Sequence, residues 1–123
     1  MNKKGLILVA DDDLDVLDTT VSLIELFGYD VIQAKNGIEA ISQYEKSRPG
    51  LVFLDVKMPK IDGYKAFFEL KKNFPDAKII LMTAHADYSK WNEAKKHDAL
   101  ALMEKPYSAE FLKNIVEKYY PKS

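Results

Sequence analysis

A chain of 123 residues can bury one sizeable core but not two, so we expect a single domain spanning residues 1–123. Hydrophobic residues make up 47% and charged residues 30%, which argues against a membrane protein or a disordered chain. Lys and Arg total 18 against 19 for Asp and Glu, so there is no basic excess for direct nucleic-acid binding. The lack of cysteine excludes disulfides and thiol catalysis, and without an apolar signal or membrane segment we expect a cytoplasmic location.

Short apolar runs alternate along the chain with longer segments of helical periodicity. In chain order, the runs that predict strands span residues 6–10, 29–34, 51–54, 78–82 and 99–103. Apolar residues three and four positions apart predict the inner faces of the helices between and after these strands: Leu14, Leu17, Val21 and Ile24; Ile38, Ile41 and Tyr44; Tyr64, Phe67 and Leu70; Phe111, Leu112, Ile115, Val116 and Tyr119. The helix from Asp87 to His97 is the weakest, because only Trp91 and Ala94 are obvious inner residues, so we expect it to be mobile or to face a partner. We expect residues 120–123 to be frayed.

Capping residues support the helix boundaries. Asn36 followed by Glu39 resembles a capping box, and Asp62 and Ser108 stand at N-cap positions of the later helices. Gly28 supplies a left-handed stop for the first helix.

The alternation of strands and helices predicts an α/β fold. Five βα units joined by right-handed crossovers give a doubly wound, flavodoxin-like (βα)5 architecture, with a five-stranded parallel sheet in the order 2-1-3-4-5. In such sheets the functional site lies outside the carboxyl ends of the strands. The residues that follow each strand are therefore the candidates for function.

Polar side chains follow four of the predicted strands. They are Asp11, Asp12 and Asp13 after the first, Asp55 after the third, Thr83 with Ala84 after the fourth, and Glu104, Lys105 and Pro106 after the fifth. Carboxylates brought together from two strands repel each other and need a cation. A hard divalent cation such as Mg²⁺ suits a small acidic cluster, because it takes one or two carboxylates and completes its shell with water and phosphate oxygens.

In their order and spacing, these segments resemble the receiver domains of response regulators in two-component signalling. The resemblance rests on residues 7–13, 51–59, 62–63, 82–84 and 105–107 and covers essentially the whole chain. It implies that Asp55 accepts a phosphoryl group as an acyl phosphate. It also implies that Asp12 binds Mg²⁺ directly, Asp11 binds it largely through water, and the backbone carbonyl of Lys57 completes the protein ligands.

The resemblance assigns roles to the last two strand ends as well. Lys105 would neutralise charge on the transferring phosphoryl group, and Thr83, followed by Ala84, would turn its hydroxyl toward the new phosphate oxygens. Pro106 would follow a cis peptide that directs Lys105 into the site. We expect self-catalysed phosphotransfer and slow autodephosphorylation, and no conventional enzyme activity.

The chain departs from the family pattern at two positions, and two further positions vary within the family. Leu102 stands where receivers often carry an aromatic residue that moves inward on activation, so that movement is not available here. Asp98 replaces a frequent Gly before the last strand. Lys57 and His85 occupy positions that tune the lifetime of the acyl phosphate in the family.

The family resemblance also implies partners. The phosphodonor would be a histidine kinase or a histidine phosphotransfer protein, and the output would be a downstream protein or an effector domain that this sequence lacks. We further expect that phosphorylation reshapes the face made by the Asp87–His97 helix, the last strand and the last helix, and that a dimer could form there.

Three alternatives compete with the receiver interpretation. A pseudo-receiver would bind proteins without being phosphorylated. The segment Asp13-Leu14-Asp15-Val16 superficially fits the motif of haloacid-dehalogenase-like phosphatases, although it is off register with the strand end. A nucleotide-binding βαβ protein would need a glycine-rich turn after the first strand, where three aspartates stand instead.

Overall fold

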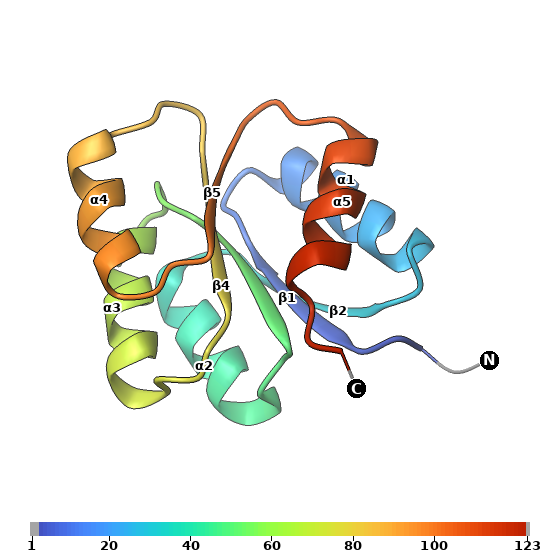
Figure 1. Cartoon of the computed structure of the whole chain (residues 1–123), viewed down its shortest axis with the longest axis horizontal. Helices are drawn as coiled ribbons and strands as arrows, with labels where there is room; N and C mark the ends of the chain where they lie inside the picture. Colours follow the sequence, from blue (N-terminus) through green and yellow to red (C-terminus); the bar gives the residue numbers. More distant parts are fainter. Residues whose placement is uncertain (1–2, 123) are drawn as a thin grey trace.

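The computed structural model describes residues 3–122 and shows strands and helices in strict alternation (Figure 1). The strands are β1 (Leu6–Ala10), β2 (Asp30–Ala34), β3 (Leu51–Asp55), β4 (Ile79–Thr83) and β5 (Ala101–Glu104). The helices are α1 (Leu14–Leu26), α2 (Gly37–Ser47), α3 (Gly63–Asn73), α4 (Tyr88–Lys96) and α5 (Ala109–Tyr119). Each predicted element is present, with boundaries that differ by a few residues at most.

All five strands form one parallel sheet in the order β2-β1-β3-β4-β5, which confirms the predicted flavodoxin-like topology. β3 and β4 are buried along their whole length, which explains why their sequences are continuous apolar runs. Because all strands run in the same direction, their carboxyl ends lie at one edge of the sheet. The chain direction therefore brings the predicted site residues together.

Helices cover both faces of the sheet. In Figure 1, α2, α3 and α4 lie on one side and α1 and α5 on the other. Two apolar clusters match these layers, one built around Phe67 and Leu70 of α3 and the other around Leu17 and Ile24 of α1. Within the described residues, no helix is both long enough and apolar enough to cross a membrane.

The predicted caps are present. The Asn36 side chain accepts the Glu39 N–H at 2.9 Å, and the Glu39 carboxylate reaches back to the N–H of Lys35 at 3.0 Å. Asp62 and Ser108 cap α3 and α5 in the same way. Gly28 has a positive φ of 103° and ends α1 as predicted. Asp98, which replaces a frequent Gly of the family, also has a positive φ, at 69°.

Three predictions about burial are wrong, and one about the chain end holds only in part. Leu14, Ile38 and Phe111 were expected on inner faces, yet they are 53%, 52% and 45% exposed. Each lies in the first turn of its helix. The chain end is also less free than predicted, because the Tyr120 hydroxyl accepts the N–H of Leu6 at 3.1 Å. Ser123 lies outside the described residues.

Candidate functional site

The sheet register places the first and third strand ends side by side. Ala10 pairs with Leu54, so Asp11 directly after β1 lies next to Asp55, the last residue of β3. Asp11 is fully buried and Asp55 is 5% exposed. Two carboxylates are thus held together at the edge of an apolar core.

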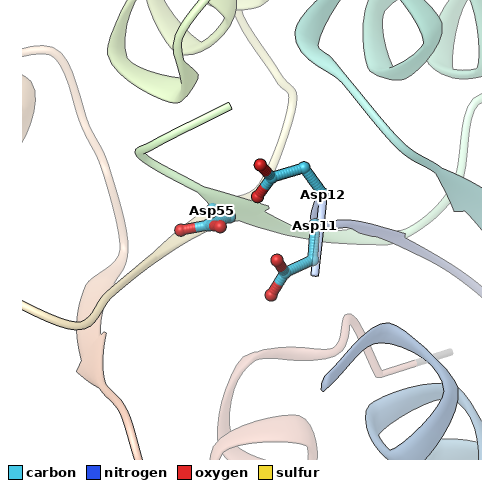
Figure 2. Close-up of side chains that lie close together, drawn as sticks. All are labelled: Asp11, Asp12 and Asp55. Atoms are coloured by element: carbon cyan, nitrogen blue, oxygen red, sulfur yellow. The ribbon is translucent and has the colours of Figure 1, made fainter. Parts of the chain in front are cut away.

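Asp12 completes an acidic cluster. Asp11, Asp12 and Asp55 each offer a carboxylate oxygen, and these oxygens all lie within 4.8 Å of one another (Figure 2). Asp12 is exposed, so the cluster is open to solvent on one side. A set made only of oxygen donors with access to water fits a hard cation such as Mg²⁺ better than it fits zinc.

Lys105 supplies positive charge to this cluster. Its Nζ donates to Asp11 Oδ2 at 2.7 Å and lies 3.3 Å from Asp55 Oδ2. Burial of the ammonium acts to lower the pKa of Lys105, but the hydrogen bond to Asp11 and the charges of Asp55 and Asp11 outweigh it and raise this pKa overall. Lys105 is therefore a cation within the site.

Asp55 is the most perturbed carboxyl group. Burial, together with the hydrogen-bonding and charge interactions of Asp11, raises the pKa of Asp55 to about 7, although the Lys105 ammonium and the Lys57 N–H act in the opposite direction. The Lys57 N–H donates to Asp55 Oδ1 at 3.4 Å. A buried carboxyl group with this pKa beside specific charged neighbours is typical of a functional site.

The three consecutive aspartates have different roles. Asp13 is the N-cap of α1, because its Oδ1 accepts the N–H groups of Asp15 and Val16 at 3.1 and 3.3 Å. Asp11 accepts the N–H of Asp13 at 3.0 Å and points its other oxygen at Lys105. The segment from Asp13 to Val16 therefore begins a helix and does not form the phosphatase motif considered above.

Thr83 lies at the end of β4 with its hydroxyl bonded to the following loop. Its Oγ1 donates to the carbonyl of His85 at 2.9 Å and accepts the N–H of His85 at 3.1 Å. Thr83 is buried, whereas Ala84 and His85 are exposed. The hydroxyl is at the predicted edge of the sheet, but in this structure it holds the β4–α4 loop.

The remaining predicted residues lie on β5 and in the loop that follows it. Leu102 is half-buried and packs against the core on the side of α2, α3 and α4. The peptide between Lys105 and Pro106 is cis, as predicted. A cavity of about 510 Å³ lies between α1 and this loop, and its lining includes Val16, Ala84 and Pro106.

One contact near the site was not predicted from the sequence, although Tyr107 belongs to the segment 105–107 that carries the family resemblance. The Tyr107 hydroxyl and Thr20 Oγ1 are 2.6 Å apart, joining the β5–α5 loop to α1. The pKa of Tyr107 is raised, and burial of the phenol is the largest cause. The one available signal is that Thr20, a hydroxyl residue, falls on the buried stripe of Leu17, Val21 and Ile24.

Comparison with known proteins gives a consistent result. Residues 7–117 match the family model described as the response regulator receiver domain. The chain is 33% identical over 121 residues to sporulation initiation phosphotransferase F of Bacillus subtilis (strain 168), covering 98% of this chain and 96% of that protein.

Some relatives are longer than this chain, and others have a similar length. It is 42% identical over 87 residues to the probable transcriptional regulator ycf27 of Porphyridium aerugineum, a match that covers 71% of this chain and 36% of that protein. Among solved structures, a CheY-like response regulator receiver domain protein from Methanospirillum hungatei JF-1 superposes with a TM-score of 0.87 at 29% identity. That alignment covers 97% of this chain and 94% of the other.

Proposed function

The chain belongs to the response regulator receiver family, and from this premise we propose that it is a signalling switch that accepts a phosphoryl group on Asp55. The proposal rests on the charged groups that surround Asp55. Its buried carboxylate lies within 4.8 Å of the oxygens of Asp11 and Asp12 and 3.3 Å from the Lys105 ammonium. This arrangement offers one nucleophilic oxygen together with the means to neutralise an incoming phosphoryl group.

The proposed reaction is a phosphoryl transfer between two groups. An ionised Asp55 oxygen attacks the phosphorus of a phosphohistidine, an O–P bond forms, and the N–P bond breaks. The histidine nitrogen keeps the electron pair and takes up a proton from solvent. Autodephosphorylation then transfers the phosphoryl group to water, which restores the Asp55 carboxylate.

Asp11, Asp12 and Asp55, with the backbone carbonyl of Lys57, would hold Mg²⁺. When bound, the ion supplies positive charge that offsets the repulsion among the carboxylates and the charge of the phosphoryl oxygens. Asp12 is the exposed member and leaves room for water ligands. Lys105 is already placed to approach the phosphoryl group from the Asp55 Oδ2 side.

Phosphorylation would also change the loop after β4. To donate to a phosphate oxygen, the Thr83 hydroxyl must give up its bond to the His85 carbonyl, and a turn of the side chain toward Asp55 would also remove the acceptor of the His85 N–H. The β4–α4 loop would then rearrange, and the change would pass to α4, β5 and α5. Leu102 cannot act as an aromatic switch, while His85 and Lys57 would tune the lifetime of the phosphorylated state.

Receivers of this family interact with histidine kinases or phosphotransfer proteins, and we propose such a donor here. The cavity between α1 and the loop of Lys105, Pro106 and Tyr107 lies beside the site and offers apolar surface to that donor. Output through a downstream protein or an effector domain, the cytoplasmic location, and a dimer through α4, β5 and α5 are further parts of the proposal.

The proposal is tested by incubating the protein with acetyl phosphate and Mg²⁺ and measuring its intact mass. We expect the mass of one phosphoryl group to be added to the wild type and to Asp30→Ala, which removes an exposed aspartate at the opposite end of the sheet. Asp55→Ala should remain unmodified. An unmodified wild type would instead indicate a pseudo-receiver, and equal labelling of Asp55→Ala would show that the acceptor lies elsewhere.

A further inference from the structure

Lys105 must be held in place by the loop that carries it, which connects β5 to α5. On one side of this loop, the Lys105 N–H donates to the carbonyl of Thr83 at 2.8 Å, which ties it to the end of β4. The ammonium itself is bonded to Asp11 and close to Asp55. Those ionic contacts would change on phosphorylation, so the position of the loop would then depend on contacts away from the reacting atoms.

Tyr107 provides that contact two residues after Lys105. Its hydroxyl is 2.6 Å from Thr20 Oγ1 in α1 and 3.9 Å from the sulfur of Met82 in β4. Thr20 and Met82 are both buried, at 2% and 0% exposure. One phenol group thus joins the Lys105 loop to α1 and to β4.

Both neighbours of Tyr107 belong to elements that carry the site. Met82 pairs with Asp55 in the sheet register and immediately precedes Thr83. Thr20 lies in α1, whose first turn follows directly on the acidic segment and is capped by Asp13. The Tyr107 hydroxyl therefore connects three elements of the site: β4, which pairs with the strand of Asp55; α1, which follows the acidic segment; and the loop that carries Lys105.

We infer that Tyr107, bonded to Thr20, is a positioning residue that holds Lys105 in register with Asp55 for phosphoryl transfer. This inference rests on the proposed phosphorylation of Asp55. The phenol touches no reacting atom, so its effect is transmitted through the backbone between Tyr107 and Lys105. Small displacements of a charged group that stabilises a phosphoryl group are costly, because electrostatic stabilisation depends on preset geometry.

The test uses variants that remove one hydroxyl each and keep the packing. Tyr107→Phe and Thr20→Val should each lower the initial rate of phosphorylation by acetyl phosphate about three- to tenfold, as expected for loss of one buried hydrogen bond. The double variant should be no slower than Tyr107→Phe, because Tyr107→Phe already removes the bond to Thr20. Thr20→Ser retains a hydroxyl and should restore a rate close to that of the wild type.

A small donor is essential in this experiment, because Thr20 and Tyr107 also line the cavity that a protein donor would contact. Tyr29→Phe serves as the matched control, since Tyr29 is a buried phenol of the same core layer just before β2, at the opposite end of the sheet. It should leave the rate unchanged. In protein with ¹³C-labelled lysine, the Lys105 side-chain resonance should move in Tyr107→Phe and Thr20→Val but not in Thr20→Ser or Tyr29→Phe.

The outcomes separate this inference from the proposed function. If the wild type is phosphorylated on Asp55 and both hydroxyl-deleting variants match its rate with an unmoved Lys105 resonance, the positioning role is wrong and the function stands. If Tyr29→Phe is slowed as much as Tyr107→Phe, the effect is general loosening of the fold and the role is again wrong. If the wild type is not phosphorylated, the proposed function fails and the inference fails with it.

Discussion

The protonation of the Asp55 carboxyl group depends on opposing influences. Burial and the adjacent Asp11 favour its neutral form, whereas Lys105 and the Lys57 N–H favour its ionised form, and the net result is a pKa of about 7. A nucleophile must be ionised, so the site as it stands is only partly prepared for attack near neutral pH. Added positive charge would complete that preparation, which gives a physical reason for a divalent cation beside Asp55.

The raised pKa of Asp55 predicts how the free energy of unfolding depends on pH when EDTA keeps the site free of divalent cations. An Asp in an unfolded chain has a pKa of about 3.9, so between that pH and about 7 the folded state holds a proton that the unfolded state has lost. The resulting stabilisation is complete below the unfolded pKa and disappears as pH rises through the folded pKa. Asp55→Asn does not titrate, so its free energy of unfolding relative to the wild type should rise by about 2 kcal/mol from pH 5.5 to pH 8.5.

Urea unfolding at the two pH values measures this difference. Asp30→Asn is the control, because it removes a carboxylate that is exposed at the opposite end of the sheet. An Asp55→Asn gain of the same size at both pH values would show that Asp55 is not held as described.

The neighbouring acids show how much the chain position alone can mislead. Asp11, Asp12 and Asp13 are consecutive and chemically identical, yet Asp13 caps a helix while the other two join Asp55. The sequence predicts that acids at this strand end share a site with Asp55. Which of these aspartates caps the helix and which join the cluster depends on where α1 begins, because the start of the helix fixes the direction of each side chain.

At the scale of elements, the first residue of α3 packs closely against the backbone of Asp55 and Val56. Gly63, the first residue of α3, donates its N–H to the carbonyl of Val56 at 2.8 Å. A Cβ at this position would overlap the carbonyl oxygen of Asp55 and the Cα of Val56, and neither backbone atom can move without moving the site. The glycine therefore permits a close approach that any side chain would prevent.

Gly63→Ala should consequently lower stability by about 2 kcal/mol or more and slow phosphorylation of the molecules that remain folded. Gly37→Ala is a matched control, because Gly37 also begins a helix and its Cβ would meet a backbone carbonyl, that of Ile61. We expect a similar loss of stability without the slower phosphorylation. Chemical unfolding and the acetyl phosphate rate, both measured at low temperature, distinguish the two. Equal rates for the two variants would argue against a role of Gly63 in placing Asp55.

The β4–α4 loop gives a second prediction at this scale. If Thr83 turns toward the phosphoryl group, the His85 N–H loses its acceptor, which is Thr83 Oγ1 at 3.1 Å. Beryllofluoride, a phosphoryl mimic, should therefore shift the amide resonance of His85 strongly in the presence of Mg²⁺. The Glu39 amide, bonded to Asn36 at the start of α2, should stay in place. An unmoved His85 amide in the beryllofluoride complex would contradict the proposed switch.

The fold was largely predictable because its signals are local. Apolar runs and caps locate the strands and helices to within a few residues, and parallel strands then bring their ends together without further information. Periodicity does not tell whether a neighbouring element covers a given turn, which is why Leu14, Ile38 and Phe111 were wrongly placed in the core. The acids at the strand ends and Lys105 were predictable for the same reason, because each follows or ends a strand that local signals locate.

Contacts between distant side chains were not predictable. Thr20 and Tyr107 are 87 residues apart, and no local pattern in either segment refers to the other. Tyr120 likewise reaches a strand at the opposite end of the chain. Such pairs depend on how α1, β5 and the chain end pack in three dimensions, which single-sequence periodicity does not specify.

For the whole molecule, the parallel sheet gathers acidic side chains at its carboxyl edge. Within the acidic cluster, the three carboxylates of Asp11, Asp12 and Asp55 are accompanied by the one ammonium of Lys105, so their repulsion is only partly compensated. A cation that binds only the folded chain relieves this repulsion and must stabilise the protein by linkage. Stability and signalling chemistry are therefore coupled through the same residues.

Mg²⁺ should accordingly raise the melting temperature, and Asp12→Ala should abolish the increase. With a dissociation constant on the order of 1 mM, 10 mM Mg²⁺ would contribute about 1.4 kcal/mol. Asp13→Asn is the control from the same segment, because Asp13 faces the first turn of α1 and not the cluster. It should keep the full Mg²⁺ response, and an equal response in Asp12→Ala would show that the metal site is misplaced.

The central claim is that Asp55 is the phosphoacceptor, and the most direct measurement locates the modified residue. After reaction with acetyl phosphate and Mg²⁺, borohydride reduces an acyl phosphate to an alcohol, so a phosphorylated aspartate becomes homoserine and can be mapped by peptide mass spectrometry. We predict homoserine at position 55 and at no other aspartate. Homoserine at Asp11, Asp12 or Asp13, or its absence from every peptide, would contradict the account.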